Sequence, residues 1–272
     1  MPKTSGKPKS EYAIQTVSNA LRMLEVLQSE TEIGVSDLAR RLGLHKNNAF
    51  RLLATLELSG FVQQSPATEL YRLGPACLVL GRAYSRSHGL MNAARPVLEE
   101  LAAREGETAH LAILQDREVV HLDGALPERH VLSRLRVGAR LPAHCTALGK
   151  TLLSARMAAR IDPSGSEAEA GDPGLDGLPL QPFTEATIVD PEKLIEHLRA
   201  VQLHGYAIDS EEFAAGLCCV AAPVRDGNAR VIAALSLSGP SARFSEERLH
   251  GEAASAIMTA ATGLSRELGS PL

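Results

Sequence analysis

The sequence predicts an α+β protein in two parts, a small helical N-terminal part and a larger part with a mostly antiparallel sheet. Two observations lead to this prediction. In the first 75 residues, three segments show the apolar spacing of helices, and two short strand-like segments follow them. From residue 108 onward, strand-like segments follow one another directly, with helical segments before and after them. The chain has 272 residues, of which 44% are hydrophobic, and this is enough for a core in each part.

The N-terminal part begins with two predicted helices. Apolar residues at three- and four-residue steps give the first helix one apolar face, made of Ile14, Val17, Leu21, Leu24 and Leu27. A short second helix is predicted from Val35, with Ser36 suited to cap its start and Gly43 suited to end it.

A third helix and a hairpin complete this part. The helix is predicted from about His45 to Ser59, with Gly60 as its stop, and its leucines face inward. Two short strands at 61–64 and 70–73 flank a Ser-Pro-Ala-Thr turn, which predicts a hairpin. This order of elements is that of a winged helix-turn-helix.

In a winged helix-turn-helix, the third helix fits the major groove of DNA with its N-terminal residues toward the base edges. Asn pairs with adenine and Arg or Lys with guanine, so we expect base contacts from His45, Lys46, Asn47, Asn48 and Arg51. We expect phosphate contacts from the preceding helix and the wing, at Ser36, Arg40, Arg41, Tyr71 and Arg72. The alternative is a dimerisation or protein-interaction module whose charges form a solvated face.

The charge distribution differs between the two parts. The whole chain has 28 basic and 32 acidic residues and a formal net charge of −4. Residues 1–75 hold nine basic and seven acidic residues, whereas the remainder holds 19 and 25. An acidic, Gly- and Pro-rich loop at 162–182 explains much of this difference. A DNA-binding part with so little excess charge would gain its affinity from a few placed contacts and two-fold symmetry.

Composition excludes several other classes. Aromatic residues are 3% with no Trp, which argues against a stacking surface for single-stranded nucleic acid. No apolar run approaches the roughly 18 residues of a membrane span, and no signal-peptide core follows the basic N-terminus. The four cysteines have no CxxC spacing, so reduced thiols and a cytoplasmic location are expected.

The second part is predicted to begin with helices and to continue as a sheet. Residues 75–105 fit two helices interrupted near His88 and Gly89, and the first of these links the parts. Its apolar face either packs within the chain or pairs with the same helix of a second subunit. Strands are predicted at 108–114, 118–125, 130–136, 205–209, 217–225 and 230–238, and helices at 145–160, 192–204 and 244–268.

The chain resembles the IclR family of bacterial transcriptional regulators over almost its whole length. The DNA-binding half of that family is similar to VSNALRMLEVL, VSDLARRLGLHKNNAFRLLATLELSGFVQQ and YRLGPACLVLG. The effector domain is similar to LPAHCTALGKTLL, GYAIDSEEFAAGLCCVAAPV and VIAALSLSGPSARF. The family often has Pro, Ser and Thr where this chain has His45, Asn47 and Asn48, so its operator sequence does not follow from those of its relatives.

The resemblance implies a GAF/PAS-like effector domain with a ligand cavity on one side of its sheet. We therefore expect a flexible basic tail at 1–12, the winged helix-turn-helix at 13–75, a linker helix at 76–90 and the effector domain at 91–272. It also favours a homodimer or a dimer of dimers, because such a regulator recognises a two-fold operator.

Candidate effector-binding residues come from a helix start and from the strands. Free backbone N–H groups after Ala143 suit a small carboxylate or phosphate, which gives the candidates His144, Cys145, Thr146 and Ala147. By resemblance, Asp209, Glu211, Cys219, Ser236 and Ser238 surround the effector cavity. The alternative is an ordinary sheet edge whose hydroxyls bond to the backbone.

Three enzymatic interpretations of the same region fail on residue type. Gly149-Lys150-Thr151 ends like a phosphate-binding loop, but that motif needs Gly at position 144, where this chain has His144. Neighbouring His144 and Cys145 supply neither the four donors of a metal site nor an activated thiol. We therefore expect no catalytic residues, metal or cofactor.

The sequence thus predicts a DNA-binding transcriptional regulator whose operator affinity is controlled by a small organic acid or a related metabolite. Its partners would be double-stranded operator DNA, the effector and a second copy of itself. One alternative is an enzyme acting on a small molecule with a winged-helix anchor. The other is a protein-interaction adaptor that does not bind DNA.

Overall fold

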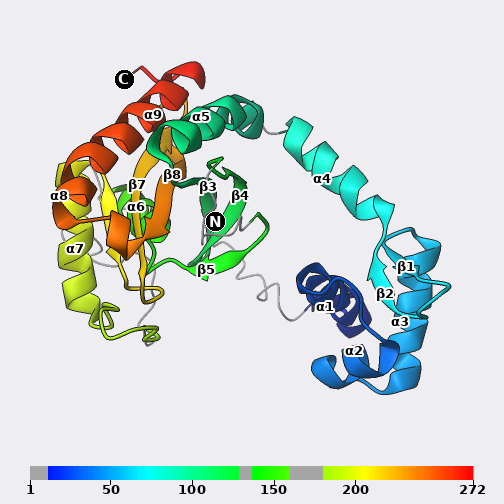
Figure 1. Cartoon of the computed structure of the whole chain (residues 1–272). Coiled ribbons are helices and arrows are strands. Elements are labelled where there is room, and N and C mark those ends of the chain that lie inside the picture. Colours follow the sequence, from blue (N-terminus) through cyan, green and yellow to red (C-terminus); the bar gives the residue numbers. More distant parts are fainter. Residues whose placement is uncertain (1–11, 88, 129–136, 160–179, 272) are drawn as a thin grey trace, which may run out of the picture. The chain divides into compact units, whose positions relative to one another are not determined.

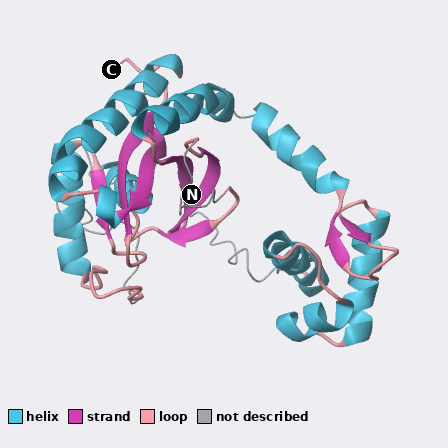
Figure 2. Cartoon of the chain, in the orientation of Figure 1, coloured by secondary structure: helices cyan, strands magenta, loops and turns pink. Residues whose placement is uncertain are grey.

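The computed structural model describes residues 12–87, 89–128, 137–159 and 180–271 (Figure 1). The chain divides into two compact units, residues 1–87 and 88–272. The predicted strand at 130–136 and most of the acidic loop at 162–182 lie outside the described residues. Figure 2 shows the first unit as mostly helical and the second as a sheet with helices packed around it.

The first unit is a winged helix-turn-helix followed by one further helix, as the sequence predicts. The hairpin strands are antiparallel, with Gln63 opposite Arg72, and an isolated bridge joins Ile33 to Tyr71. The elements are α1 (Gln15–Ser29), α2 (Val35–Leu42), α3 (Lys46–Leu58), β1 (Val62–Gln64), β2 (Tyr71–Leu73) and α4 (Pro75–Ser87).

The turn between α2 and α3 confirms one predicted helix end and corrects one predicted cap. Gly43 ends α2 with a φ of 65°, in the left-handed region that favours glycine. The predicted cap at Ser36 is wrong, because α2 begins one residue earlier and Gly34 is its N-cap. Ser36 instead lies in the first turn with its side chain exposed.

The core of the first unit uses only part of the predicted apolar face of α1. Met23 and Leu27 are buried in this core. Ile14, Val17 and Leu21 lie toward the start of the helix and are 67%, 53% and 56% exposed. The apolar face of α1 therefore extends beyond the core of its own unit.

The second unit contains one six-stranded sheet of order β5-β4-β3-β8-β7-β6, in which every neighbouring pair is antiparallel. This confirms the predicted α+β class with an antiparallel sheet. The short strand β5 was absent from the prediction. The strands are β3 (Thr108–Gln115), β4 (Glu118–Ala125), β5 (Arg140–Pro142), β6 (Ala207–Ser210), β7 (Leu217–Arg225) and β8 (Val231–Pro240).

Helices cover both faces of this sheet (Figure 1). One core joins α5 (Gly89–Glu105) and α9 (Ala254–Glu267) to one face, through residues such as Leu98, Ile257 and Leu235. A second core joins α6 (Ala147–Ala159) and α7 (Pro191–His204) to the other face. There the sheet presents the small residues Ala112, Ala221 and Ala234, which let α6 approach closely.

The predicted helix at 244–268 is interrupted near its start. A 3₁₀ turn (Ser241–Arg243) precedes α8 (Glu246–Arg248), and a π-helical turn (Leu249–Ala253) leads into α9. Ser245 caps α8 by accepting a hydrogen bond from the backbone N–H of Arg248. In the described part of the chain, no helix has the length and apolar content needed to cross a membrane.

Candidate functional site

The start of α3 presents a polar surface to solvent. His45, Lys46, Asn47, Asn48 and Arg51 are all exposed, while Ala49 and Leu53 anchor the other side of the helix in the core. The His45 ring caps the helix by accepting a hydrogen bond from the backbone N–H of Asn47. An exposed polar N-terminal half is the arrangement that a helix needs to read base edges in a major groove.

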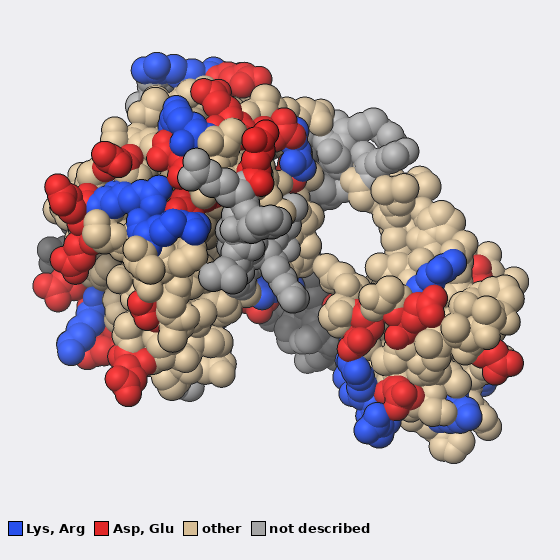
Figure 3. Space-filling model, viewed as in Figure 1, with Lys and Arg blue, Asp and Glu red and all other residues tan. Residues whose placement is uncertain are grey.

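Three arginines beside this helix already have carboxylate partners. Arg40 pairs with Asp37, Arg41 with Glu30 and Arg72 with Glu32, at 2.6, 2.6 and 3.5 Å. Such exposed ion pairs are worth only about 0–1 kcal/mol each, so exchange of the carboxylate for a DNA phosphate costs little. On the face of the molecule seen in Figure 3, basic and acidic side chains are interspersed over both units.

The structure removes Tyr71 from the predicted phosphate-binding set. Strand alternation turns Arg72 outward and Tyr71 into the core, where Tyr71 is 2% exposed. Burial, together with the charges of Glu57 and Glu69, raises the pKa of its hydroxyl. The residue supports the wing from inside and is unavailable to DNA.

The sequence prediction overlooked Phe50 on the same helix. Its side chain is 53% exposed although it belongs to a helix whose other large apolar residues face inward or lie at its end. An exposed aromatic ring on a recognition helix suits apolar contact with the methyl group of thymine. The apolar periodicity alone gave no signal that Phe50 lies outside the core.

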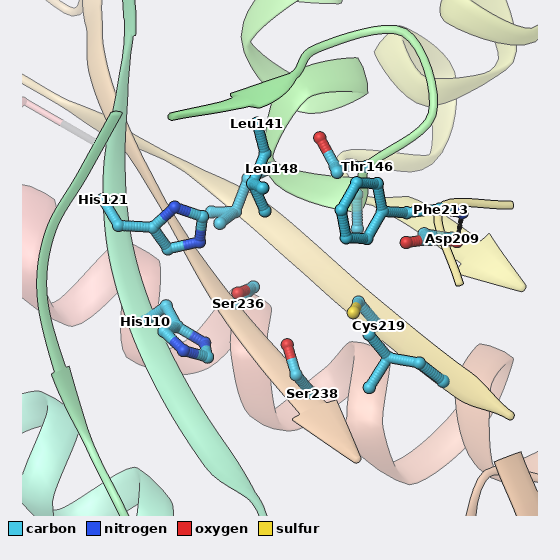
Figure 4. A pocket seen from close by; sticks show the side chains of 12 residues that line it. His110, His121, Leu141, Thr146, Leu148, Asp209, Phe213, Cys219, Ser236 and Ser238 are labelled. Atoms are coloured by element: carbon cyan, nitrogen blue, oxygen red, sulfur yellow. Dashed lines mark hydrogen bonds between the residues drawn. The ribbon is translucent and has the colours of Figure 1, made fainter. Parts of the chain in front are cut away.

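The second unit contains a small cavity of about 30 Å³ between the start of α6 and the sheet (Figure 4). Six of the nine residues proposed as effector-binding line it: Thr146, Ala147, Asp209, Cys219, Ser236 and Ser238. Six further lining residues were not predicted: His110, His121, Leu141, Leu148, Phe213 and Leu217.

Pairing between strands brings the polar lining residues together. Asp209 on β6 lies opposite Cys219 on β7, which lies opposite Ser238 on β8. Ser236, two residues along β8 and on the same face, lies opposite His110 on β3. The sheet thus carries a polar surface assembled from four strands.

The start of α6 offers backbone donors to the cavity. The first hydrogen bond of the helix runs from the N–H of Lys150 to the carbonyl of Thr146, at 2.9 Å. The hydroxyl of Thr146 accepts from the N–H of Gly149. Ala147 and Leu148 both line the cavity and precede these bonds, so their N–H groups lie at the positive end of the helix dipole.

Three predicted effector residues do not line the cavity. His144 Nε2 bonds to the carbonyl oxygen of Gln181 at 3.0 Å, and burial lowers the pKa of its imidazole. Cys145 is fully buried, which raises the pKa of its thiol to about 12. Glu211 has a φ of 59°, outside strand geometry, and its carboxylate accepts from the N–H of Gly216 at 3.0 Å.

A buried ion pair holds the turn that carries Phe213. Lys150, with no exposed surface, pairs with the buried carboxylate of Glu212. The Asp209 carboxylate accepts from the N–H groups of Glu212 and Phe213, at 2.8 and 3.4 Å. Burial raises the pKa of Asp209 to about 7, although Lys150 lowers it in part. Phe213 thereby stays over one side of the cavity.

Comparison with family models matches both units. The model of the IclR helix-turn-helix domain matches residues 16–66, and that of the bacterial transcriptional regulator IclR C-terminal domain matches residues 82–266. The HTH-type transcriptional regulator XynR of Escherichia coli (strain K12) is 36% identical over 259 residues, which are 95% of this chain and 98% of that protein.

Solved structures show the same architecture. The IclR protein of Thermotoga maritima superposes with a TM-score of 0.73 at 28% identity, covering 94% of this chain and 100% of that one. An IclR homologue from Microbacterium hydrocarbonoxydans, complexed with 4-hydroxybenzoate, gives a TM-score of 0.77 at 27% identity and covers 93% and 99% of the two chains.

Proposed function

The chain belongs to the IclR family of bacterial transcriptional regulators, and we propose that its effector is a small carboxylic acid bound between α6 and the sheet. As a member of this family it is a DNA-binding regulator controlled by a small-molecule effector, and not an enzyme. The observation that carries the proposal is the start of α6 in the cavity lining, where Ala147 and Leu148 precede the first hydrogen bond of the helix. The 4-hydroxybenzoate bound by the Microbacterium homologue is itself a carboxylate, which supports this ligand class.

For DNA recognition, we propose that α3 reads the base edges and that arginines beside it hold phosphates. Base contacts would come from the exposed residues His45, Lys46, Asn47, Asn48 and Arg51. Phosphate contacts would come from Ser36, Arg40, Arg41 and Arg72. A regulator of bacterial genes works beside the chromosome, so the cytoplasm is the location that we propose.

We further propose that the protein acts as a homodimer. Ile14, Val17 and Leu21 on α1 are more than half exposed, and Leu78, Val79 and Leu80 on α4 are exposed as well. Apolar surfaces of this kind in a DNA-binding unit suit contact with a second copy. The effector would favour one arrangement of the dimer, and a coupling of about 1–3 kcal/mol would change operator affinity roughly 5–150-fold.

The test is a titration of DNA with the full chain, with binding measured by fluorescence anisotropy. The DNA comes from upstream of the gene that encodes this protein and of neighbouring genes. An acid that binds the protein should change the affinity for that DNA at least about fivefold. Equal DNA affinity with and without every acid that binds would refute effector control by this ligand class.

A variant of the recognition helix separates the regulator from the adaptor alternative. Arg51→Ala should weaken binding to the target DNA by about 1–3 kcal/mol, or roughly 5–150-fold. Arg199→Ala, at an arginine on α7 in the second unit, is the matched control and should leave DNA binding unchanged. Unchanged binding by Arg51→Ala would favour the adaptor.

A further inference from the structure

We propose that the effector carries hydroxyl groups in addition to its carboxylate, so that the cavity selects hydroxy acids over unsubstituted acids of the same carbon number. This inference rests on the proposed function, because it specifies the ligand chemistry of the same cavity. It comes from side chains that the carboxylate site at α6 does not use.

Ser236 is the first of these side chains. It is 1% exposed and points into the cavity from the middle of β8 (Figure 4). Its hydroxyl has no hydrogen-bond partner within the part of the chain that the structure describes. A buried hydroxyl without a partner is destabilising, whereas a ligand hydroxyl there could either accept a hydrogen bond from it or donate one to it.

Two histidines form the wall beside Ser236. His110 on β3 and His121 on β4 are both buried, and their rings meet edge to face with centroids 5.1 Å apart. In Figure 4 they lie across the cavity from Thr146, Asp209 and Phe213. A neutral imidazole has one donor and one acceptor nitrogen, as a hydroxyl does, so this wall matches hydroxyl groups better than alkyl carbons.

A second carboxylate fits this wall less well. The described residues that line the cavity include no Lys or Arg, while Asp209 already places one carboxyl group there. The start of α6 offers positive potential from the backbone, and that accounts for one carboxylate. The remaining polar positions therefore suit uncharged hydroxyl groups.

The test measures the affinity of the full chain for paired acids of equal carbon number by isothermal titration calorimetry. The pairs are propionate and glycerate, butyrate and threonate, and hexanoate and gluconate, with succinate as the second-carboxylate probe. In the pair that binds tightest, the hydroxylated acid should bind at least about tenfold more tightly than its partner. Equal affinities within every pair, or tighter binding of succinate than of threonate, would overturn the inference.

Variants then test whether the wall of Ser236 and the two histidines causes the preference for hydroxy acids. Ser236→Ala and His110→Phe should each reduce the ratio of the affinities for the hydroxylated and the unsubstituted acid at least about threefold. Ser270→Ala is the matched control, because the Ser270 hydroxyl is also buried without a partner among the described residues but lies outside the cavity lining. A preference that survives both cavity variants would contradict the assignment.

The outcomes also separate this inference from the proposed function. Binding of carboxylic acids without any preference for hydroxyl groups overturns only the hydroxy-acid inference. Failure of every acid in the series to bind overturns the proposed carboxylate effector together with it.

Discussion

We predict that Asp209 makes effector binding depend on pH, in a direction that follows from its surroundings. Its carboxyl group lines the cavity, and burial raises its pKa from 3.8 to about 7. A carboxylate ligand in the same cavity adds a like charge, which raises the pKa of Asp209 further. Binding should therefore take up a proton at Asp209 whenever the pH exceeds about 7.

The size of the effect follows from the fraction of Asp209 that is protonated before binding. With a pKa of about 7, this fraction is roughly nine-tenths at pH 6 and one-tenth at pH 8. If the bound form stays protonated over this range, affinity for the acid falls about tenfold between pH 6 and pH 8. Because the pKa of Asp209 is raised, the protonated form that favours binding is fully populated at low pH. It is lost as the pH rises through about 7.

Several other titratable groups lie near Asp209. The Cys145 thiol, with a pKa of about 12, stays protonated. Lys150 and Glu212 form the buried ion pair beside Asp209, and His110, His121 and Cys219 line the cavity with it. A variant of Asp209 itself is therefore needed to assign the proton.

Calorimetry in two buffers of different ionisation enthalpy measures this proton uptake directly. The tightest-binding acid of the paired series should take up close to one proton per site at pH 8. In Asp209→Asn, the amide oxygen still accepts from the N–H groups of Glu212 and Phe213, so the turn is kept while the titration is lost. The same pH slope in wild type and Asp209→Asn would refute the assignment of the proton to Asp209.

Three further predictions concern the ion pair, the recognition helix and the dimer. Lys150→Met leaves the Glu212 carboxylate buried without its partner, so chemical denaturation should show a loss of about 3–5 kcal/mol, and Lys150→Met with Glu212→Gln should recover most of it. If the double variant were as unstable as Lys150→Met alone, the unpaired buried charge would not be the cause of the lost stability. Phe50→Ala should weaken DNA binding about threefold, and uracil in place of thymine should weaken the wild type equally without affecting the variant. Additive losses would exclude a methyl contact by Phe50. Leu21→Glu should shift the protein from dimer to monomer in sedimentation, whereas Leu203→Glu, at an exposed leucine on α7, should not; an unchanged dimer in Leu21→Glu would place the interface elsewhere.

The sequence predicts the elements of both units well because their apolar periodicity is local. Helices α1 to α3 and strands β4 and β7 follow the predicted segments closely. Local patterns failed where contact with a distant segment decides whether a side chain is buried. Tyr71 resembles a phosphate-binding wing residue until its strand is paired with Ile33 and its ring enters the core.

The residues that line the cavity are even harder to predict from local patterns in the sequence. Ser236 and Ser238 were predicted from the resemblance to the family, and alternation along one strand places them on the same face. His110 joins them only because β3 pairs with β8, and His121 only because β4 pairs with β3 in turn. Strand order in a sheet is a long-range property, so no spacing within the sequence connects these histidines to the serines.

The Gly149-Lys150-Thr151 segment shows how structure resolves a pattern that favours phosphate binding. A Cβ at position 149 would lie 2.1 Å from the carbonyl oxygen of Ala143, so glycine is needed for close packing rather than for a phosphate. Lys150 is committed to Glu212, and the Thr151 hydroxyl donates to the carbonyl oxygen of Ala221 at 3.2 Å. Each residue of the motif thus fixes α6 to the structure around it, and the proposed carboxylate would bind to the N–H groups at the helix start instead. The rejected nucleotide site and the proposed carboxylate site are therefore linked, because the contacts that occupy the motif also hold those N–H groups at the cavity.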